Sequence, residues 1–141
     1  MKEIDNGWQV VNVPAEGSHP PHSYSIGLFA TFEHPEIVVI GLPAQTAQHL
    51  INNLADEVRE GATFEPGARY DHVLKGYDVV FVRVAPEYYK EYFGRALEHY
   101  GAISFSMLQM VWPDRNRHYP WDKACAQDIR NLQPVLARAQ R

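Results

Sequence analysis

Residues 77–84 constrain the fold more than any other stretch of the chain. Alternate side chains of an extended strand point to opposite faces, and here both faces are apolar. Valines occupy one face, and Tyr77, Val79 and Phe81 occupy the other. A strand that is apolar on both sides belongs inside a sheet whose two faces are covered. The sequence therefore predicts an interior strand with helices packed on both faces of its sheet.

Three other segments have the features of helices. Residues 44–60 carry apolar side chains on one stripe at helical spacing, and Gly61 is a typical C-terminal stop. Residues 86–100 begin with a proline and an acid, which suit a first turn, and keep aromatic residues at the helical period. A last, short helix is expected at residues 122–132, with Asp122 as its N-cap.

The remaining strand candidates are short and are separated by turn residues. They lie at residues 7–13, 24–28, 36–40, 68–74 and 104–112. The order of elements mixes hairpins with helical crossovers, and no change in composition divides the chain. We therefore predict one α+β domain over residues 1–141, with a mostly antiparallel, twisted sheet packed by two or three helices.

One strand candidate has a face made of small residues. Ser25 and Gly27 alternate with Tyr24 and other bulky side chains. The small side chains would let another backbone or a ligand approach closely. Trp8, Trp112, Trp121 and the tyrosines could line a flat apolar cleft that takes a planar ligand, and this strand is the candidate floor of that cleft.

Composition excludes several classes of function. The 141 residues include 13 basic and 17 acidic side chains, and the formal net charge is −4. Basic residues do not cluster before the C-terminal arginines, so no nucleic-acid partner is expected. No apolar run approaches the ~18 residues that span a bilayer, and no apolar leader begins the chain. With Cys125 as its single cysteine, the chain is expected to be cytoplasmic, without membrane partner or disulfide.

The histidines of the chain suggest a metal site only as an alternative. His19 and His22 flank two prolines, and His34 follows a short distance on. The chain has neither an H-E-x-x-H nor a C-x-x-C motif, which are the common zinc-binding patterns. We therefore predict no metal site and expect loop histidines exposed to solvent. No glycine-rich phosphate loop appears either, so no cofactor is assigned.

The loop after the last strand offers a different chemistry. Asp114 or Asp122 could hold His118 in one tautomer and make it a general base, while a neighbouring arginine binds an anion. No nucleophile is marked, because the chain lacks a G-x-S-x-G elbow. In the alternative interpretation, Asp114 caps a turn, and Trp112 and Trp121 cover the core.

The second helix suggests a way to self-associate. Its aromatic residues would form a homodimer interface if they were partly exposed. These residues are Tyr88, Tyr89, Tyr92 and Phe93.

Short motifs are spread along residues 7–136: Gly7-Trp8-x-Val10, Tyr24-Ser25-Ile26-Gly27-Leu28, His34-Pro35-Glu36-Ile37, Gly41-Leu42, Gly61, Leu108-Gln109-x-Val111-Trp112-Pro113-Asp114, Pro120-Trp121 and Gln133-Pro134. By these motifs the chain resembles a family of small bacterial proteins catalogued as domain of unknown function 4262. The resemblance implies a bacterial, cytoplasmic protein and transfers no catalytic residue, because the family has no agreed activity. Where family members have a glycine after the Trp-Pro-Asp motif, this chain has Arg115 to His118.

Aromatic and titratable residues at strand ends and in loops predict a small-molecule or partner-binding domain. We expect the strand of Tyr24 and the strand of Trp112 to end at one rim of the sheet. The alternatives are a hydrolase or transferase that uses a His118–carboxylate pair, with or without metal, and an interaction protein that forms a homo-oligomer. The candidate ligand-binding residues are His22, Tyr24, His34, Glu36, Trp112, Asp114, His118 and Trp121.

Overall fold

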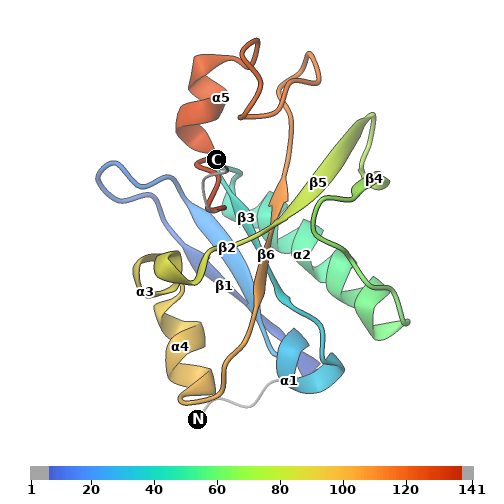
Figure 1. Ribbon diagram of the computed structural model, residues 1–141, viewed down its shortest axis with the longest axis vertical. Helices are drawn as coiled ribbons and strands as arrows, with labels where there is room; N and C mark the ends of the chain where they lie inside the picture. Colours follow the sequence, from blue (N-terminus) through green and yellow to red (C-terminus); the bar gives the residue numbers. More distant parts are fainter. Residues whose placement is uncertain (1–6, 138–141) are drawn as a thin grey trace.

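A six-stranded mixed sheet runs through the computed structural model, which describes residues 7–137 (Figure 1). The spatial order is β1-β2-β3-β6-β5-β4, and β3 and β6 are parallel while the other neighbours are antiparallel. The predicted α+β class and mostly antiparallel sheet are therefore confirmed. The strands are β1 Gln9–Val13, β2 His22–Ile26, β3 Glu36–Ile40, β4 Arg69–Leu74, β5 Tyr77–Arg83 and β6 Met107–Val111.

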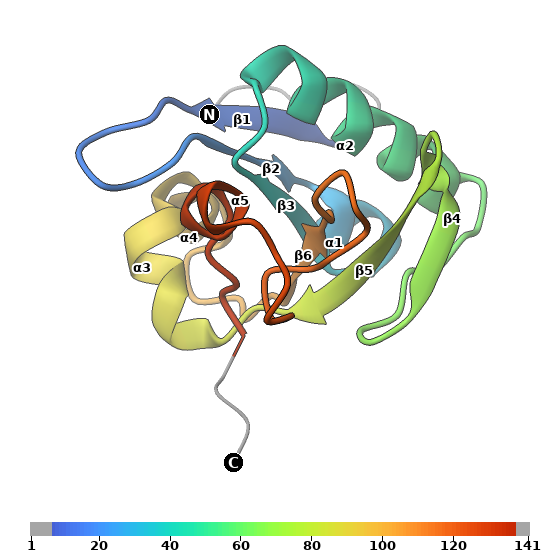
Figure 2. The ribbon, with the colours of Figure 1, turned by 90° about the horizontal axis from the view of Figure 1, so that it is seen from above.

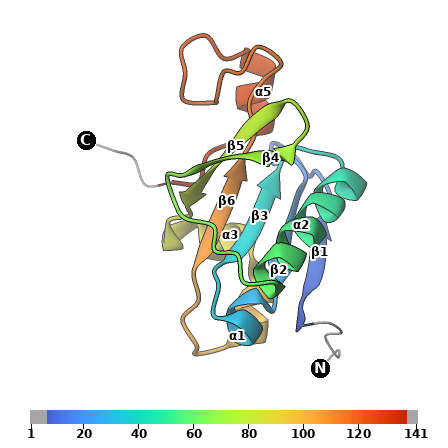
Figure 3. The same cartoon turned by 90° about the vertical axis from the view of Figure 1, so that its right-hand side faces the viewer.

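Helices cover the two faces of the sheet unequally. The long helix α2 (Ala44–Arg59) lies across β1, β2 and β3 on one face, as Figure 3 shows. On the other face lie α3 (Tyr89–Tyr92) and α4 (Gly94–Tyr100) (Figure 2). The last helix, α5 (Gln127–Leu132), lies beyond the end of the sheet (Figure 1), and its Ile129 packs against the cluster on the α2 side. The described residues contain no helix long and apolar enough to cross a membrane.

Two hydrophobic clusters fill the space between the sheet and these helices. On the α2 side, the apolar stripe of α2, including Ile51 and Leu54, packs against Ile37 and Val39. On the other side, Phe93 and neighbouring residues of α3 and α4 pack against alternate residues of β2 and β3. Each fully buried aliphatic side chain contributes about 1.5–3 kcal/mol, so these two clusters are the main source of stability.

The prediction that helices cover both faces of residues 77–84 is confirmed on one face and only in part on the other. Val79 and Phe81 lie in the cluster on the α2 side. On the opposite face, Val80 packs against Tyr119 in the loop that follows β6, and Val82 is only partly buried. A loop covers Val80, because α3 and α4 lie over the β1 to β3 half of the sheet (Figure 2). Val84, on the same face just after β5, is buried in the cluster that includes residues of α3 and α4.

The second predicted helix is broken into three short pieces. A 3₁₀ turn (Pro86–Tyr88) leads into α3, and α4 begins only after Phe93 leaves the helical conformation with φ −126° and ψ 44°. Gly94 follows, and glycine resists a helical conformation more than other residues except proline. Tyr92 and Phe93 are buried in the core, so the expected exposed aromatic stripe is reduced to half-buried Tyr88 and its neighbour.

The last helix is shorter than predicted and is not capped by Asp122. It begins at Gln127, and the Oδ2 atom of Asp122 accepts a hydrogen bond of 2.8 Å from the backbone N–H of Tyr119 instead. Asp122 therefore holds a turn of the preceding loop, which is a common use of an aspartate outside a helix. Cys125 lies in that loop and is buried, as expected of a small apolar side chain.

The small face of β2 allows the close backbone approach that its sequence predicted. Gly27 has φ +122°, and a Cβ atom built on it would lie 2.3 Å from the carbonyl oxygen of Gly7. The backbone before β1 therefore lies directly against Gly27. A short helix that the sequence did not reveal, α1 (Leu28–Phe32), begins at the next residue.

Candidate functional site

The predicted site residues lie at both ends of the sheet and not at one rim. His22 begins β2 opposite Ile40, at the end of β3, and the indole N–H of Trp112 donates to the carbonyl oxygen of Ile40 at 2.9 Å. His34 and Glu36 lie at the start of β3, roughly 13 Å of strand away from Ile40. Tyr24 lies between the two ends, buried in the core. The loop after β6, which carries Asp114, His118 and Trp121, is at the His22 end (Figure 1).

Glu36 is a buried carboxylate that organises the start of α1. Its two oxygens accept hydrogen bonds from the hydroxyl of Ser25 at 2.7 Å and from three backbone N–H groups, at Gly27, Leu28 and Phe29. The hydroxyl of Tyr100 donates a further hydrogen bond. Burial raises the pKa of the Glu36 carboxyl, while these hydrogen bonds favour its charged form. With every contact internal, Glu36 has the geometry of a structural group.

His34 is also held from both sides by the fold. Its Nδ1–H donates to the carbonyl oxygen of Pro35 at 2.8 Å, and its Nε2 accepts from the backbone N–H of Phe64 at 3.0 Å. These two partners fix the neutral Nδ1–H tautomer. Burial lowers the pKa of the His34 imidazole, which agrees with a neutral ring. No nitrogen of this ring is left for a ligand.

Asp114 organises the loop after β6, as the alternative interpretation proposed. Its Oδ1 accepts from the backbone N–H groups of Asn116 and His118, both at 2.9 Å, and its Oδ2 accepts from Ala126 at 3.1 Å. The hydrogen bond from the His118 backbone is the main reason that the pKa of Asp114 is lowered. The Nδ1 atom of His118 lies 3.6 Å from Oδ2 of Asp114, beyond hydrogen-bond distance. The candidate base and carboxylate are therefore neighbours without a direct bond.

The three tryptophans do not share a cleft. Trp112 is buried in the cluster beside α2, and Trp8 donates its indole N–H to Asn52 of α2 at 2.9 Å. Trp121 is 49% exposed and stacks on Tyr119, with 5.4 Å between ring centroids. Trp112 covers the core as the alternative interpretation expected, whereas Trp121 does not.

Among the described cavities, the one that contains a predicted site residue lies beside His22. We call it the His22 cavity; its volume is about 490 Å³, within the range of small-molecule sites. The loop between β1 and β2 forms most of its wall, and α3 contributes Glu91. The lining residues are Val13, Pro14, Glu16, Gly17, Ser18, His19, Pro20, His22 and Glu91.

A tight turn orders the wall of the His22 cavity. Glu16 and His19 exchange two backbone hydrogen bonds of 3.0 and 2.9 Å, and Gly17 between them has φ +58°. Two-residue turns of this kind favour glycine, because one or both of their central residues need a positive φ. The turn places the imidazole Nε2 of His19 2.5 Å from Oε2 of Glu91, so the loop is tied to α3.

His22, which lines the cavity, has a buried imidazole ring. Its side chain is 6% exposed, contrary to the expectation of a solvent-exposed histidine, and its ring packs against Tyr24, Tyr92 and Phe93. Nε2–H donates to the carbonyl oxygen of Tyr92 at 2.8 Å. Burial, with a smaller effect from His19, lowers the pKa of His22, so the ring is neutral and Nδ1 carries a lone pair. That Nδ1 is buried and has no hydrogen-bond partner among the described residues.

The side chains around the cavity accept hydrogen bonds and carry negative charge. Glu16 and Glu91 bring two carboxylates, and His22 lines the cavity with a neutral ring whose Nδ1 atom is itself buried. Such a set favours ligands that donate hydrogen bonds, above all ammonium groups. In the part of the chain that the structure describes, no three His, Cys, Asp or Glu side chains are placed to hold a metal ion.

Sequence reasoning missed Glu16 and Glu91. Glu91 lies 72 positions from its partner His19, on a helix whose packing against β2 could not be inferred from local patterns. The only signal in the sequence was the pair of prolines between His19 and His22, which restricts the loop.

Comparison with known proteins places the chain in a family but gives it no activity. No curated protein matches the chain, and no solved structure matches it. One family model does match, described as a domain of unknown function (DUF4262), over residues 4–126. That match covers β1 to β6 and the loop after β6, including every residue that lines the His22 cavity. The chain therefore belongs to the DUF4262 family.

Proposed function

We propose that this domain binds a small organic cation, a primary amine or polyamine, in the His22 cavity. The observation that carries the proposal is a cavity whose wall brings the carboxylates of Glu16 and Glu91 together with the ring of His22. The Nδ1 atom of that ring is buried and has no hydrogen-bond partner among the described residues. A buried acceptor without a partner is unfavourable by about 1–3 kcal/mol, and a donor from a ligand would remove that penalty. The proposal keeps the predicted small-molecule binding, but it places the binding site at the start of β2 and not at the loop of Trp112 and Trp121.

An amine fits this site better than an anion or an apolar molecule. Glu91 and Glu16 repel an anion, and Glu91 already holds His19 in a position where an incoming ammonium could share the carboxylate. The neutral ring of His22 accepts from an ammonium and does not repel it. Recognition thus depends on the neutral state of His22 and on the negative charge of Glu91.

Thermal unfolding with defined probes tests the proposal. Putrescine, spermidine and ethanolamine are each added in excess, and glycerol and acetate serve as neutral and anionic probes. Ligands that bind only the folded state raise the melting temperature by mass action. We expect at least one amine to raise it by several degrees, and glycerol and acetate to leave it unchanged.

Matched variants connect the effect to the cavity. Glu91→Gln removes one charge with little change in shape and should abolish the amine shift. Glu98→Gln, at an exposed position of α4, removes the same charge away from the cavity and should retain it. His22→Phe keeps an aromatic ring without the lone pair and should also lose the shift. An amine shift that survives in both Glu91→Gln and His22→Phe would contradict the proposal.

The acid–base alternative rests on His118 and Asp114. It is favoured by the Nδ1 atom of His118, which is buried without a hydrogen-bond partner among the described residues and lies 3.6 Å from Oδ2 of Asp114. Against it, both oxygens of Asp114 already accept backbone hydrogen bonds, which lowers the basicity of the carboxylate. Hydrolysis of p-nitrophenyl acetate that His118→Asn abolishes and His99→Asn retains would support this alternative over simple binding.

A further inference from the structure

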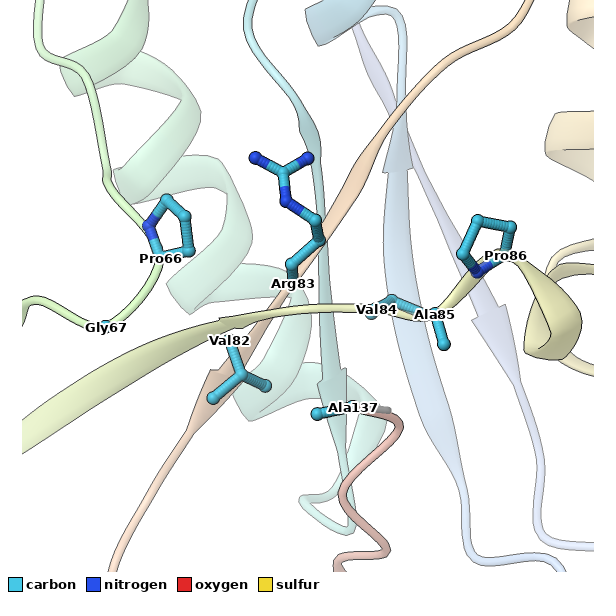
Figure 4. Close-up of a pocket in the computed structure, with 8 residues that line it drawn as sticks. All are labelled: Pro66, Gly67, Val82, Arg83, Val84, Ala85, Pro86 and Ala137. Carbon is cyan, nitrogen blue, oxygen red and sulfur yellow. The ribbon is translucent and has the colours of Figure 1, made fainter. Parts of the chain in front are cut away.

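A second cavity, of about 540 Å³, lies at the edge of β5 next to the end of the described chain (Figure 4). It is separate from the His22 cavity and shares no residue with it. Its walls are mostly apolar and belong to the turn before β4, to the end of β5 and to the C-terminal segment. The lining residues are Pro66, Gly67, Val82, Arg83, Val84, Ala85, Pro86 and Ala137.

The backbone of β5 changes partners along this edge. The backbone hydrogen bonds of Phe81 are on the side of β5 that faces away from β6. Its N–H donates to the carbonyl oxygen of Ala68, and its carbonyl oxygen accepts from the N–H of Gly67 at 2.7 Å. The N–H of Val84 points to the opposite side, where it donates a hydrogen bond of 2.9 Å to the carbonyl oxygen of Met107 at the start of β6. Because backbone groups alternate in direction along an antiparallel strand, odd-numbered residues of β5 face away from β6. The N–H and carbonyl groups of Arg83 therefore point towards the cavity.

On the edge of β5 that faces away from β6, Arg83 lies between two residues whose backbone groups are hydrogen-bonded. On one side, Phe81 is paired with the segment before β4, and on the other side the N–H of Ala85 donates to Leu136 at 2.8 Å. Leu108 of β6 lies opposite Arg83 in the register, but on the edge that faces away from β6 the described residues provide no backbone hydrogen-bond partner for Arg83. A single residue of an extended chain could pair there by exchanging two hydrogen bonds, which is the unit of β-strand addition.

The side chain of Arg83 indicates the charge of the incoming residue. The side chains of Val82 and Arg83 leave β5 on opposite sides (Figure 4). Arg83 is exposed, and no carboxylate of the described residues forms an ion pair with it. In a hydrogen-bonded antiparallel pair, the two facing side chains lie on the same side of the sheet. A glutamate or aspartate paired with Arg83 would therefore place its carboxylate beside the guanidinium group.

From this unpaired backbone position and this charge, we propose that the edge of β5 binds an extended acidic peptide segment of a partner protein. One acidic residue of the partner pairs with the backbone of Arg83 and with its guanidinium group. Its apolar neighbours contact Pro66 on one side and Pro86 and Ala137 on the other. The proposal concerns a protein partner and is independent of amine binding in the His22 cavity.

Peptide titration of the full chain, followed by amide NMR and hydrogen exchange, tests the proposal. The probe is valine-glutamate-valine, acetylated at one end and amidated at the other. We expect it to shift the amide signal of position 83 and to slow the exchange of that amide. The same peptide with lysine in place of glutamate, and one with an N-methylated glutamate that cannot donate, should each bind at least about tenfold more weakly.

Two charge variants separate a specific pair from general attraction. Arg83→Gln should weaken binding of the acidic peptide about tenfold and make it insensitive to the exchange of glutamate for lysine. Arg115→Gln, in the exposed loop after β6, should bind like the parent chain. Equal binding of all three peptides, or perturbation away from position 83, would overturn the proposal. So would a concentration-dependent dimer that protects this amide without peptide, since the occupant would then be a second copy of the chain.

Discussion

Gln133 binds the backbone of Trp112 on both sides of the residue. Its side-chain Oε1 accepts from the Trp112 N–H at 2.9 Å, and its Nε2 donates to the Trp112 carbonyl oxygen at 2.7 Å. The amide thus replaces a neighbouring strand where β6 ends. Gln109 makes the reciprocal contact, since its Nε2 donates to Pro134 and its Oε1 accepts from Leu136. Two glutamines therefore attach the C-terminal segment to β6.

Gln133→Leu should destabilise the protein by about 2–4 kcal/mol, because it removes two hydrogen bonds and leaves two buried backbone groups unpaired. Urea unfolding measures the difference. Gln127→Leu, whose amide bonds only to Asn131 on the surface of α5, should change stability by less than about 0.5 kcal/mol. Similar losses in the two variants would contradict the role assigned to Gln133.

Glu36→Gln should destabilise the protein by about 3 kcal/mol, because the amide presents donors to groups that already donate. The exposed Glu33→Gln, three residues earlier, is the matched control and should be close to neutral. The comparison uses denaturant midpoints at neutral pH. A small effect of Glu36→Gln would show that the network around α1 can rearrange around an amide.

Gly27→Ala and Gly61→Ala should differ strongly although both residues have positive φ. At Gly61 a Cβ atom meets nothing within 4 Å, so only backbone strain of about 1 kcal/mol is expected. At Gly27 it would lie 2.3 Å from a backbone oxygen, so a loss of more than about 3 kcal/mol follows. Equal losses would mean that the segment containing Gly7 moves away without penalty.

Stability should fall as the pH decreases through the ordinary histidine range. The pKa values of His22 and His34 are both lowered by burial from 6.5, so the unfolded chain takes up protons before the folded one does. Their contribution is fully present above pH 6.5 and is lost below it. Melting temperatures between pH 8 and pH 5 measure this loss, and the double variant His22→Asn/His34→Asn should show a flatter profile.

Glu36 changes the pH dependence of stability in the opposite direction to the two histidines, so the experiment needs a control for its titration. Burial raises the pKa of its carboxyl from 4.5, so its unfavourable contribution decreases as the pH falls from its raised folded-state value towards 4.5. The double variant His22→Asn/His34→Asn is therefore also made in the Glu36→Gln background, and its profile is compared with that of Glu36→Gln alone. A profile that keeps its full slope without His22 and His34 would contradict the assignment to these histidines.

The sequence predicted the elements that are determined by local patterns. The apolar stripe of α2 and the strands β2, β3 and β5 follow from side-chain spacing, and the fold class follows from their order. The break at Phe93 could not be predicted, since the buried ring serves packing against β2 at the expense of helical conformation. Likewise, α1 has only five residues and begins where Glu36, eight residues on, supplies hydrogen-bond acceptors.

The candidate site was predicted less well than the fold. The sequence identified His22 but not its burial, which results from Tyr92 and Phe93 on a distant helix. It grouped His22 with Glu36 because both lie near strand ends, whereas the direction of β3 places them at opposite ends of the sheet. Strand direction depends on long-range pairing and is not encoded in local composition.

The position of β6 between β3 and β5 affects the order in which the protein can fold during synthesis. Until the ribosome has released residues 107–111, the β1–β2–β3 half and the β4–β5 half have no strand to join them. Both halves then present an open sheet edge, and open edges are where chains pair with the wrong partner. Because β6 is made late, both edges are open at the same time, and aggregation should increase when translation pauses before residue 107.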